Sequence, residues 1–461
     1  MVPPSFLERF VHTFTPEPFR QLARQTGWLK RLHKIDPFEF FTSLVFGQLS
    51  ASRQTLVAQV QGLSVPVSRQ GVDQRFTPEA VDYFQAAFAH VLAQTLDWSP
   101  TQPQAGLLRT HFKAFYLLDS TSFDCPELLK DIFPACGGSG SAANVKVLLR
   151  YELISGRLEP LQLLAGKRSD QGQALGSAER LRAGELQLQD KGFYSAQAWQ
   201  AAEQRGAFLL MPLPHNLTLW LSPDPEARKE LAFDLAGALR VSSHSQVEWP
   251  QLFLGSPGHR TGALRLVAFR LGEESAARQR QGLRESMRKQ GRTPTAKALE
   301  LAGWLLLLTN APQDKLPSAM MSYVYRLRWQ VELIFRQIKT TLRLDQSESD
   351  KPCRVQCEIW ARLTSAVLLF LWHAHANAQC WRLHGGEASF EKIVQLLAQW
   401  GHALGRALLG TPAALLDLVR TIWGHLLANG DKGKQKSRRS SWENLFELWL
   451  NVPVPGAQLI V

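Results

Sequence analysis

Apolar residues recur along this chain at two different periods, and the change of period divides it into regions. Over the first hundred residues the spacing is helical, with helices predicted at Pro37–Leu49, Thr55–Val60 and Val81–Leu96 and with proline and glycine between them. From Phe115 onward, short apolar or alternating segments follow one another, which is typical of strands. The chain therefore predicts a helical N-terminal region followed by a sheet.

The segments after Phe115 alternate between candidate strands and helices. Strands are expected at Phe115–Leu118, Val145–Ile154, Leu158–Leu164, Glu185–Gln189 and Ala207–Met211, with a helix at Ser195–Gln204. Strands that precede and alternate with helices are typical of an α/β core with a mixed sheet. The sequence therefore predicts such a core.

An irregular region interrupts this core. It contains two candidate strands, Val247–Leu254 and Ala263–Phe269, and a basic candidate helix, Glu273–Arg288. The core then resumes with a strand at Trp304–Thr309 and a long helix from about Pro317 to Leu342. We therefore predict a helical N-terminal region (1–105), an α/β core (106–211 and 304–345), an insertion (212–303) and a helical C-terminal region (346–461).

The charge of the chain adds information about its partners. Hydrophobic residues make up 45% of the 461 residues and charged residues 20%, a globular balance for about two to four domains. Lysine and arginine number 52 against 40 aspartates and glutamates, which leaves a formal net charge of +12. Such a surplus favours polyanions, because each neutralised phosphate releases condensed counterions. Composition alone does not distinguish DNA from RNA or from an acidic membrane surface.

Cysteines and apolar runs indicate the compartment. The five cysteines are few and odd in number, which favours a reducing compartment without a disulfide framework. The first residues, MVPPSFLERF, lack the basic-then-apolar pattern of a signal peptide. The most apolar stretches, Trp304–Leu308 and Ala366–Trp372, are much shorter than the about 20 apolar residues that span a bilayer. We expect a cytoplasmic protein with no membrane partner.

Two aspartates follow candidate strands of the core. Asp119 comes after the apolar run Phe115–Leu118, and Asp190 comes after Glu185–Gln189 and shortly before Gly192. Carboxylates at strand ends can hold Mg²⁺, and two such ions about 4 Å apart promote phosphodiester cleavage and strand transfer. An aspartate at a strand end can also simply cap a turn, so neither residue alone decides between these two interpretations.

A third acid, Glu332, lies in the long predicted helix. At about 100° per residue, Tyr325, Arg328, Glu332 and Lys339 fall within roughly 60° of one another on its surface. A solvated stripe of i,i+4 ion pairs would have the same pattern. The stripe is surrounded by apolar residues, which favours a packed helix. A carboxylate beside cations on the only polar face of such a helix suits a phosphate site.

The spacing of these four residues carries a resemblance. Tyr-x2-Arg-x3-Glu-x6-Lys resembles the signature of family four of the bacterial insertion-sequence transposases, a branch of the DDE superfamily with a ribonuclease-H-like core. Leu117-Leu118-Asp119-Ser120-Thr121 is similar to the family's first-aspartate strand. Asp190-Lys191-Gly192-Phe193-Tyr194 is similar to its second-aspartate motif, in which arginine more often follows the aspartate. The resemblance covers about residues 115–342.

The resemblance implies a fold and a role for each matching residue. The fold would be an α/β ribonuclease-H-like core with a mixed sheet and a β-rich insertion, flanked by helical N- and C-terminal regions. Catalysis and the binding of two Mg²⁺ ions, with Mn²⁺ as an alternative ion, would fall to Asp119, Asp190 and Glu332. Contacts to DNA at the cleaved end would fall to Tyr325, Arg328 and Lys339. Arg336 joins the DNA-binding set from helix geometry alone.

The implied function is that of a DNA transposase, which cleaves the ends of an insertion sequence and joins them to target DNA. Two alternatives stay open: a ribonuclease-H-like nuclease or resolvase that cuts without joining, and a non-catalytic DNA-binding protein derived from a transposase. A mobile element has two ends and the chain holds one carboxylate trio, so we expect a homodimer on double-stranded DNA, in the bacterial cytoplasm at the nucleoid. The apolar segments Ala366–Trp372 and Leu445–Leu450 are the expected dimer contacts, with packing on the catalytic core as the alternative.

Two features of the helical regions, a pair of segments and a group of four residues, allow more than one interpretation. Thr55–Gln61 and Ser68–Phe76 form either a helix-turn-helix or an ordinary helical hairpin, which is commoner. In the first case the groove would be contacted by Arg69, Gln70, Asp73 and Gln74. Cys353 and Cys357 with His373 and His375 form either a zinc site or, as is commoner at this spacing, buried side chains.

Two basic stretches are candidate contacts to DNA. One is the cluster from Arg278 to Arg292, and the other is the polar segment from Lys432 to Arg439. Both could also be solvated surface. The net charge favours DNA contacts for the first stretch and nonspecific binding for the second.

Overall fold

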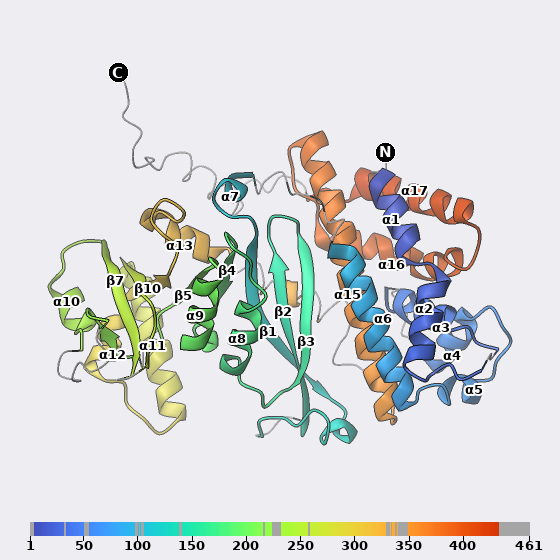
Figure 1. Ribbon diagram of the computed structural model, residues 1–461, viewed down its shortest axis with the longest axis horizontal. Helices are drawn as coiled ribbons and strands as arrows, with labels where there is room; N and C mark the ends of the chain where they lie inside the picture. The colour runs from blue at the N-terminus through green and yellow to red at the C-terminus, as the bar shows by residue number, and fades with distance from the viewer. Residues whose placement is uncertain are drawn as a thin grey trace. The chain divides into compact units, whose positions relative to one another are not determined.

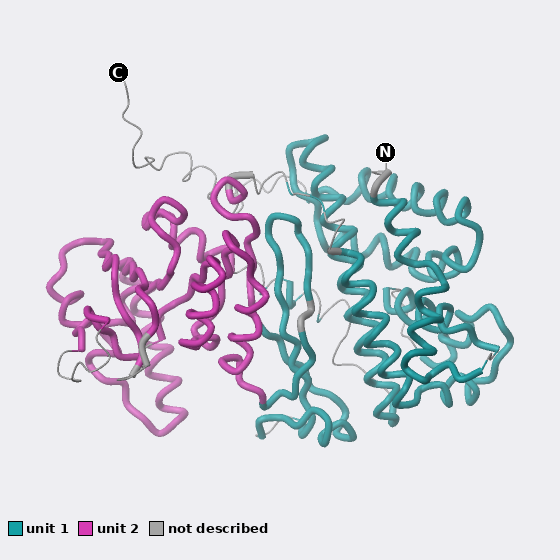
Figure 2. The backbone as a smooth tube through the Cα atoms, in the orientation of Figure 1, with its two compact units in different colours: residues 1–106, 120–167, 332–437 teal, residues 107–119, 168–331, 438–461 magenta. Residues whose placement is uncertain are grey.

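The structure, a computed structural model, divides the chain into two compact units (Figure 2). It describes residues 4–31, 34–49, 55–96, 100, 102, 106–137, 141–214, 217–223, 232–256, 259–328, 332, 334–336, 339 and 349–432. Unit 1 comprises Met1–Gly106, Ser120–Lys167 and Glu332–Ser437, and unit 2 includes Leu107–Asp119 and Arg168–Val331. Each unit is thus assembled from segments that are far apart in the sequence.

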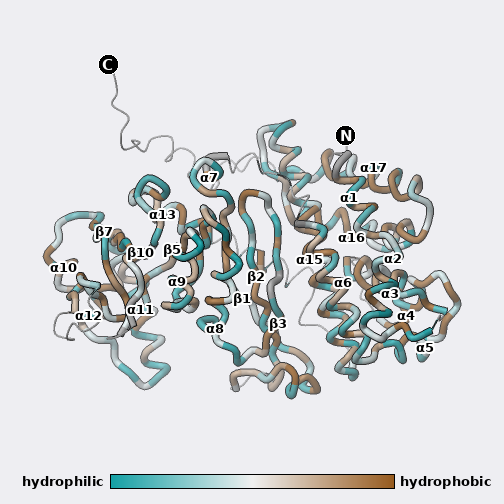
Figure 3. The backbone as a smooth tube through the Cα atoms, in the orientation of Figure 1, coloured by the Kyte–Doolittle hydropathy of each residue, from teal (hydrophilic) through white to brown (hydrophobic). Residues whose placement is uncertain are grey.

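Unit 1 is mostly helical (Figure 1), and hydrophobic residues recur along its helices between hydrophilic ones (Figure 3). Its helices are α1 (Pro4–Thr13), α2 (Pro16–Gln25), α3 (Pro37–Leu49), α4 (Leu56–Gly62), α5 (Arg69–Asp73), α6 (Pro78–Leu96), α15 (Pro352–His384), α16 (Phe390–Ala407) and α17 (Pro412–Asn429). It also contains the turn η2 (Glu127–Leu129) and the antiparallel hairpin of β2 (Ala143–Glu152) and β3 (Arg157–Ala165). The helical character predicted for both flanking regions is confirmed within the described residues.

Helix α15 is the centre of unit 1. It packs against α3, α6 and β3, and each side chain of its central segment Ala366–Trp372 is at most 2% exposed. The ring centroid of Trp372 lies 5.0 Å from that of Phe6 and 5.9 Å from that of Trp423, so α1 and α17 meet on this helix. Although α15 is long and apolar enough to cross a membrane, 94% of its most apolar window is buried inside the protein. That burial is typical of a core helix.

The burial of α15 corrects one prediction about dimer contacts. The sequence predicts that Ala366–Trp372 contacts a second chain, and this is wrong, because these side chains fill the interior of unit 1. A helix buried on all sides is apolar all round, so its sequence resembles that of an exposed patch awaiting a partner. The second predicted contact, Leu445–Leu450, lies outside the described residues.

Unit 2 is built on a mixed sheet (Figure 1). In spatial order its strands are β1 (Phe115–Cys125), β4 (Leu186–Gln189), β5 (Phe208–Pro212), β10 (Trp304–Thr309), β9 (Leu264–Arg270), β7 (Gln246–Ser256) and β6 (Leu219–Trp220), and β8 (His259–Arg260) pairs with β7. β1, β4 and β5 are parallel, and the pairings from β5 through β10 and β9 to β7 are antiparallel. The predicted mixed sheet is confirmed. Strand β1 passes into unit 1 after Asp119 and neighbours β2 there.

The helices of unit 2 connect these strands. They are α7 (Gly106–His111), α8 (Gln171–Ala178), α9 (Ala196–Gln204), α10 (Leu235–Val241), α11 (Glu273–Lys289), α12 (Ala296–Leu301), α13 (Ser318–Arg326) and the turn η3 (Lys191–Phe193). Hydroxyl caps define where two of them begin, because Ser195 accepts from Ala198 N and Thr295 accepts from Ala298 N.

The insertion continues the core sheet. Its strand β9 pairs with β10 from Arg270 opposite Trp304 to Arg265 opposite Thr309, and β7 pairs with β9 in turn. The region that the sequence identifies as a β-rich insertion also holds three helices, α10, α11 and α12. The strand pattern was readable from the sequence, whereas the pairing with β10 depends on backbone hydrogen bonds between distant segments.

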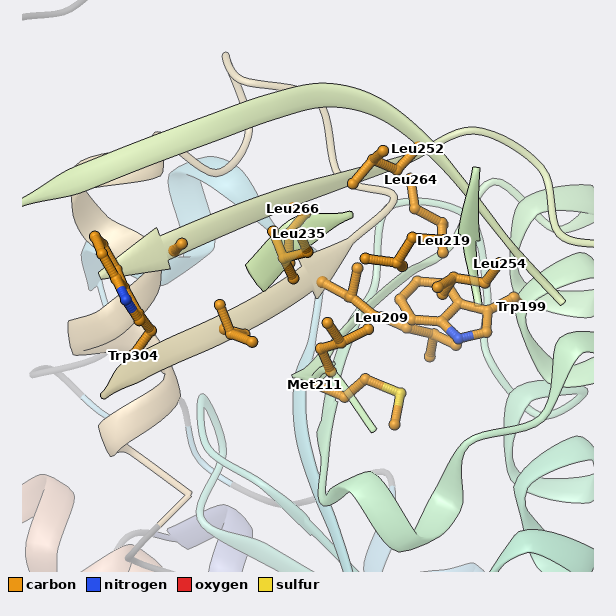
Figure 4. Packing of buried hydrophobic residues seen from close by; sticks show 14 of the residues in the cluster. Trp199, Leu209, Met211, Leu219, Leu235, Leu252, Leu254, Leu264, Leu266 and Trp304 are labelled. Atoms are coloured by element: carbon orange, nitrogen blue, oxygen red, sulfur yellow. The ribbon is translucent and has the colours of Figure 1, made fainter. Parts of the chain in front are cut away.

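One hydrophobic cluster joins the insertion to the core of unit 2 (Figure 4). Trp199 on α9 and Leu209 and Met211 on β5 pack in it together with Leu235 on α10 and Leu266 on β9. Because both parts contribute to one interior, we expect them to unfold together.

The cluster yields a prediction for stability. Leu266 is fully buried, so Leu266→Ala should lower the free energy of unfolding by about 2 to 5 kcal/mol, the usual cost of emptying a leucine site in a core. Leu221 is 59% exposed in the same unit, and Leu221→Ala should change it by less than about 0.5 kcal/mol. Urea unfolding followed by tryptophan fluorescence measures both. Equal effects of the two substitutions would contradict the described packing.

Candidate active site

Asp119 and Asp190 lie next to each other across two parallel strands. The register of β1 and β4 pairs Phe115 with Leu186 and ends with Leu118 opposite Gln189, so the next residue of each segment is an aspartate. Adjacent strands lie about 4.8 Å apart, so residues that directly follow a paired position begin close together. Both carboxylates also interact electrostatically with Tyr325, which places them near one another in unit 2.

Strand β1 continues beyond Asp119, contrary to the prediction that it ends there. It runs to Cys125, and Asp119 and Ser120 are half-buried in its middle. The polar residues after Asp119 alternate with buried ones, which is the pattern of a strand with one exposed face. The pairing with β4 nevertheless ends just before Asp119, since Asp190 opens the turn η3. The aspartate pair thus marks the point where β1 and β4 separate.

Asp190 does not act as a turn cap. It precedes η3 with an extended backbone, φ −77° and ψ 163°, and its side chain accepts no capping hydrogen bond. Capping is the common structural role of an aspartate at this position. Its absence here favours a role for the half-buried carboxylate in binding.

Arg328 contacts the first aspartate. Its Nη1 lies 3.4 Å from Asp119 Oδ2, and the two side chains are 21% and 19% exposed. The Cζ of Arg328 also lies 5.8 Å from the ring centroid of Tyr325. The guanidinium therefore sits between the tyrosine and the carboxylate, and its planar fork of donors matches the geometry of a phosphate.

Tyr325 lies within the electrostatic reach of both aspartates. Burial raises the pKa of Tyr325 to about 12; the hydrogen-bonded Arg328 lowers it, and the charges of Asp190 and Asp119 raise it. The phenol therefore keeps its proton at neutral pH and remains a hydrogen-bond donor. Four of the predicted site residues are thus brought together in unit 2: Asp119, Asp190, Tyr325 and Arg328.

The helix that carries Tyr325 is shorter than predicted. The sequence predicts one helix from about Pro317 to Leu342, whereas α13 ends at Arg326 and a turn follows, in which Arg328 N donates to Tyr325 O at 3.0 Å. Such an i→i+3 bond tightens the last turn of a helix. Hydrophobic periodicity does not reveal this break, because apolar residues resume at helical spacing directly after it.

Glu332, Arg336 and Lys339 follow this turn in the chain and belong to unit 1. Between Glu332 and Lys339, the structure describes only residues 334–336. All three are helical; Glu332 is half-buried, and the two cations are exposed. Glu332 comes four residues after Arg328 in the chain, so their Cα atoms can be at most about 14 Å apart. The assignment of Glu332 as the third carboxylate, and of Arg336 and Lys339 as DNA contacts, stays a prediction.

A further carboxylate, Asp170, lies near the pair. A Cβ added at Gly192 would lie 3.8 Å from Asp170 Oδ2 and 4.0 Å from Asp190 Oδ2, so the two carboxylates border the same small space. Asp170 begins α8 without a side-chain capping bond. The sequence does not single it out, because it follows the polar segment Lys167-Arg168-Ser169 instead of a strand.

The donor set of unit 2 suits a hard cation. Asp119, Asp190 and Asp170 offer only oxygen atoms, and Mg²⁺ in proteins commonly uses one or two carboxylates together with water and substrate phosphates. Among the described residues, these three aspartates do not come together as one metal-binding group. Asp119 and Asp190 could supply two carboxylate ligands, and water or a substrate phosphate would supply the others.

The helix-turn-helix candidate is a short helical pair. α4 and α5 pack on each other, and α5 has five residues, fewer than the predicted segment Ser68–Phe76. Arg69, Gln70 and Gln74 are exposed, whereas Asp73 forms an ion pair with Lys351. Asp73 is thus engaged within unit 1, which favours the hairpin interpretation.

The zinc interpretation of the cysteine pair in α15 gains no support. Cys357 and His375 are buried in the core helix, and His373 Nε2 lies 3.2 Å from Ala388 O. Burial lowers the pKa of His373 to about 4. The described part of the chain contains no metal-binding group that includes these residues, which agrees with buried side chains.

The first basic stretch lies on an exposed helix. On α11 and just after it, the exposed cations are Arg278, Arg284, Arg288, Lys289 and Arg292. Arg280 differs, because its Nε donates to Leu299 O at 3.1 Å and so holds α12. In the second stretch, Lys432 pairs with Glu387 at 2.7 Å, and the remaining cations lie outside the described residues.

Comparison with known proteins identifies the family of the chain. Residues 110–368 match the family model described as the transposase DDE domain, and this segment contains the aspartate pair, Tyr325, Arg328 and Glu332. The matched segment makes up more than half of the chain.

Several relatives are similar over most of their length. The transposase for insertion sequence element IS231B of Bacillus thuringiensis subsp. berliner is 24% identical over 95% of this chain and 94% of its own length. The transposase for IS1151 of Clostridium perfringens is 23% identical over 77% of this chain and 78% of its own. Transposase InsL of element IS186A of Escherichia coli (strain K12) is 31% identical over 78% of this chain and 91% of its own. The chain belongs to the DDE-superfamily transposases of insertion sequences.

Proposed function

We propose that this transposase cleaves the ends of its insertion sequence and joins them to target DNA at a two-metal site held by Asp119, Asp190 and Glu332, on a ribonuclease-H-like core. The observation that supports this most directly is the in-register position of the two aspartates where the parallel strands β1 and β4 separate. Strand transfer needs such a site on a rigid scaffold, and a sheet supplies it.

The carboxylates have a simple task in this mechanism. Asp119 and Asp190 present oxygen atoms from adjacent strands, and Glu332 follows four residues after Arg328. Mg²⁺ held there would activate the attacking water or hydroxyl and stabilise the leaving oxygen. Half-burial of both aspartates keeps the site accessible to a DNA strand while weakening the screening of charge by water.

Tyr325 and Arg328 would bind the phosphate at the cleaved end. Arg328 supplies a cation 3.4 Å from Asp119, and the neutral phenol of Tyr325 supplies a hydrogen-bond donor, whose pKa is raised to about 12 by burial. Both groups would therefore donate hydrogen bonds to phosphate oxygens next to the carboxylates. Lys339 and Arg336, both exposed, would extend this contact along the DNA backbone.

We place the protein in the bacterial cytoplasm at the nucleoid, as a homodimer on DNA. The net charge of +12 and the exposed cations of α11 suit binding to double-stranded DNA. Two element ends require two active sites, and the chain supplies one aspartate pair followed by one candidate glutamate.

Removal of a carboxylate tests the active site. Asp119→Asn, Asp190→Asn and Glu332→Gln should each slow cleavage of an element end in Mg²⁺ by at least about a thousandfold, because a lost metal ligand removes several kcal/mol of transition-state stabilisation. Gel shifts should show nearly unchanged binding to the end DNA. The control is Asp124→Asn, which changes an exposed aspartate on β1, and this variant should cleave at the normal rate. Near-normal cleavage by any of the three variants removes that residue from the proposed trio.

Salt dependence tests the contact with DNA. The logarithm of the binding constant should fall linearly with the logarithm of salt concentration, by about 0.9 for each phosphate contacted. Replacing Arg278, Arg284 and Arg288 together by glutamine should make this slope shallower by about 2 to 3. Arg420→Gln, which removes an exposed cation on α17, is the control. An unchanged slope in the triple variant would exclude α11 from the interface.

Stoichiometry tests the assembly. Light scattering of the protein bound to end DNA should show two chains in each complex that cleaves, because each element end needs its own active site. Mixing wild-type protein with Asp190→Asn should yield complexes that cleave only one of two ends. A single chain in a cleavage-competent complex would refute the dimer.

A further inference from the structure

Arg265 on β9 is a buried arginine of the insertion and is only 8% exposed. All its hydrogen-bond donors are used, four of them on the segment from Ala311 to Ser318. Nη1 donates to Ala311 O at 2.7 Å and to Leu316 O at 3.1 Å, and Nη2 donates to Ser318 Oγ at 2.6 Å and to Gln313 Oε1. Nε donates to Glu248 Oε1 at 3.1 Å. The five N–H groups of the guanidinium thus have five acceptors.

Four of these acceptors belong to one stretch of the chain. Residues 310–317 connect β10 to α13, and Ser318 is the first residue of α13. Two acceptors are backbone carbonyls, so Arg265 holds the path of the backbone as well as its side chains. Arg265 therefore determines where α13 begins.

A second strand of the insertion holds the same point. Glu248 on β7 accepts from Ser318 Oγ through its Oε2 at 2.6 Å and from Arg265 through its Oε1. Ser318 is only 2% exposed, so these bonds are made away from competing water. The start of α13 is thus fixed by β7 and β9 together.

Helix α13 transmits this position to the candidate active site. It packs on β9 and β10, and its Met320, Met321 and Val324 are buried. Tyr325 lies on the helix seven residues after Ser318, and Arg328 lies in the turn that follows. At about 1.5 Å per residue, Tyr325 is only roughly 10 Å from the clamped end. A helix this short and this well packed moves as one piece.

We propose that Arg265 is a positioning residue of the transposition reaction, which places Tyr325 and Arg328 against the carboxylates through Ser318 and α13. This inference rests on the proposed function of those two residues at the cleaved DNA end. It gives the insertion a role in the active site besides any contact of its own with DNA. Lysine cannot replace Arg265, because one ammonium group has three donors and cannot reach five acceptors arranged around a planar fork.

The test compares single-turnover cleavage of an element end at saturating protein. Arg265→Lys should slow the bound complex about tenfold to a hundredfold, since misplacement of a reacting group by about 1 Å has an effect of that size. Ser318→Ala removes one hydroxyl and should slow cleavage in the same direction with little risk to folding. The matched control is Arg270→Lys, an exposed arginine on the same strand that contacts Trp304 and Ser242 O instead of the loop.

A double-mutant cycle separates positioning from stability. If Arg265 acts through Arg328, then Arg265→Lys should slow an Arg328→Lys protein by less than about threefold, because the group it positions is already impaired. Urea unfolding of each variant establishes the folded fraction, to which the rates are normalised. A merely structural role would instead give full cleavage rates for the folded fraction, or the same slowing whichever residue occupies position 328. Either result would overturn the proposal.

The same measurements distinguish failure of this inference from failure of the proposed site. If Arg328→Lys itself cleaves at the wild-type rate, the role of Arg328 at the DNA end is wrong, and positioning through it is wrong as well. If Arg328→Lys is slow while Arg265→Lys and Ser318→Ala are normal, the site stands and only the role of Arg265 is refuted.

Discussion

Parallel pairing of β1 with β4 is the constraint on which the rest of the site depends. Backbone hydrogen bonds hold the strands about 4.8 Å apart, and the register places Asp119 and Asp190 at equivalent positions. Two carboxylates held near each other repel, and a cation beside them offsets that repulsion. Arg328 is such a cation, because its Nη1 lies 3.4 Å from Asp119 Oδ2. Under the proposed function, metal ions would offset the rest of the repulsion.

The groups around the pair differ in charge. The phenol of Tyr325 is neutral at neutral pH, and burial raises its pKa further from neutrality, whereas the guanidinium of Arg328 is cationic and contacts both the tyrosine and the first aspartate. Under the proposed function, both groups would donate hydrogen bonds to a phosphate. Arg328 and Asp119 are only partly exposed, so water screens their interaction less than it would on an open surface.

The insertion and the elements that carry the candidate active site form one continuous scaffold in unit 2. Its strand β9 lies beside β10 over six residue pairs, and its side chains share one hydrophobic interior with α9 and β5. The guanidinium of Arg265 then extends this connection from packing to hydrogen bonding, at the start of the helix that carries Tyr325. An insertion attached in this way stabilises α13, the helix that carries Tyr325.

The order of the elements and the candidate chemistry follow from the amino-acid pattern alone. Period-two alternation and short apolar runs predict β4, β5, β9 and β10 to within one residue or two, because strand side chains that face a core are apolar whichever strand lies beside them. The pattern identifies the aspartates because each follows such a run, and Glu332 because its spacing from Tyr325 and Arg328 is a recognisable signature.

Facts that join distant segments come only from the folded chain. They are the pairing of β1 with β4 that brings Asp119 and Asp190 close, the break in the helix after Arg326, the burial of Ala366–Trp372, and the loop held by Arg265. The hydrophobic pattern of a segment shows which face of its helix or strand is apolar. The segment that covers this face is selected by packing and hydrogen bonds between parts of the chain that are far apart in the sequence.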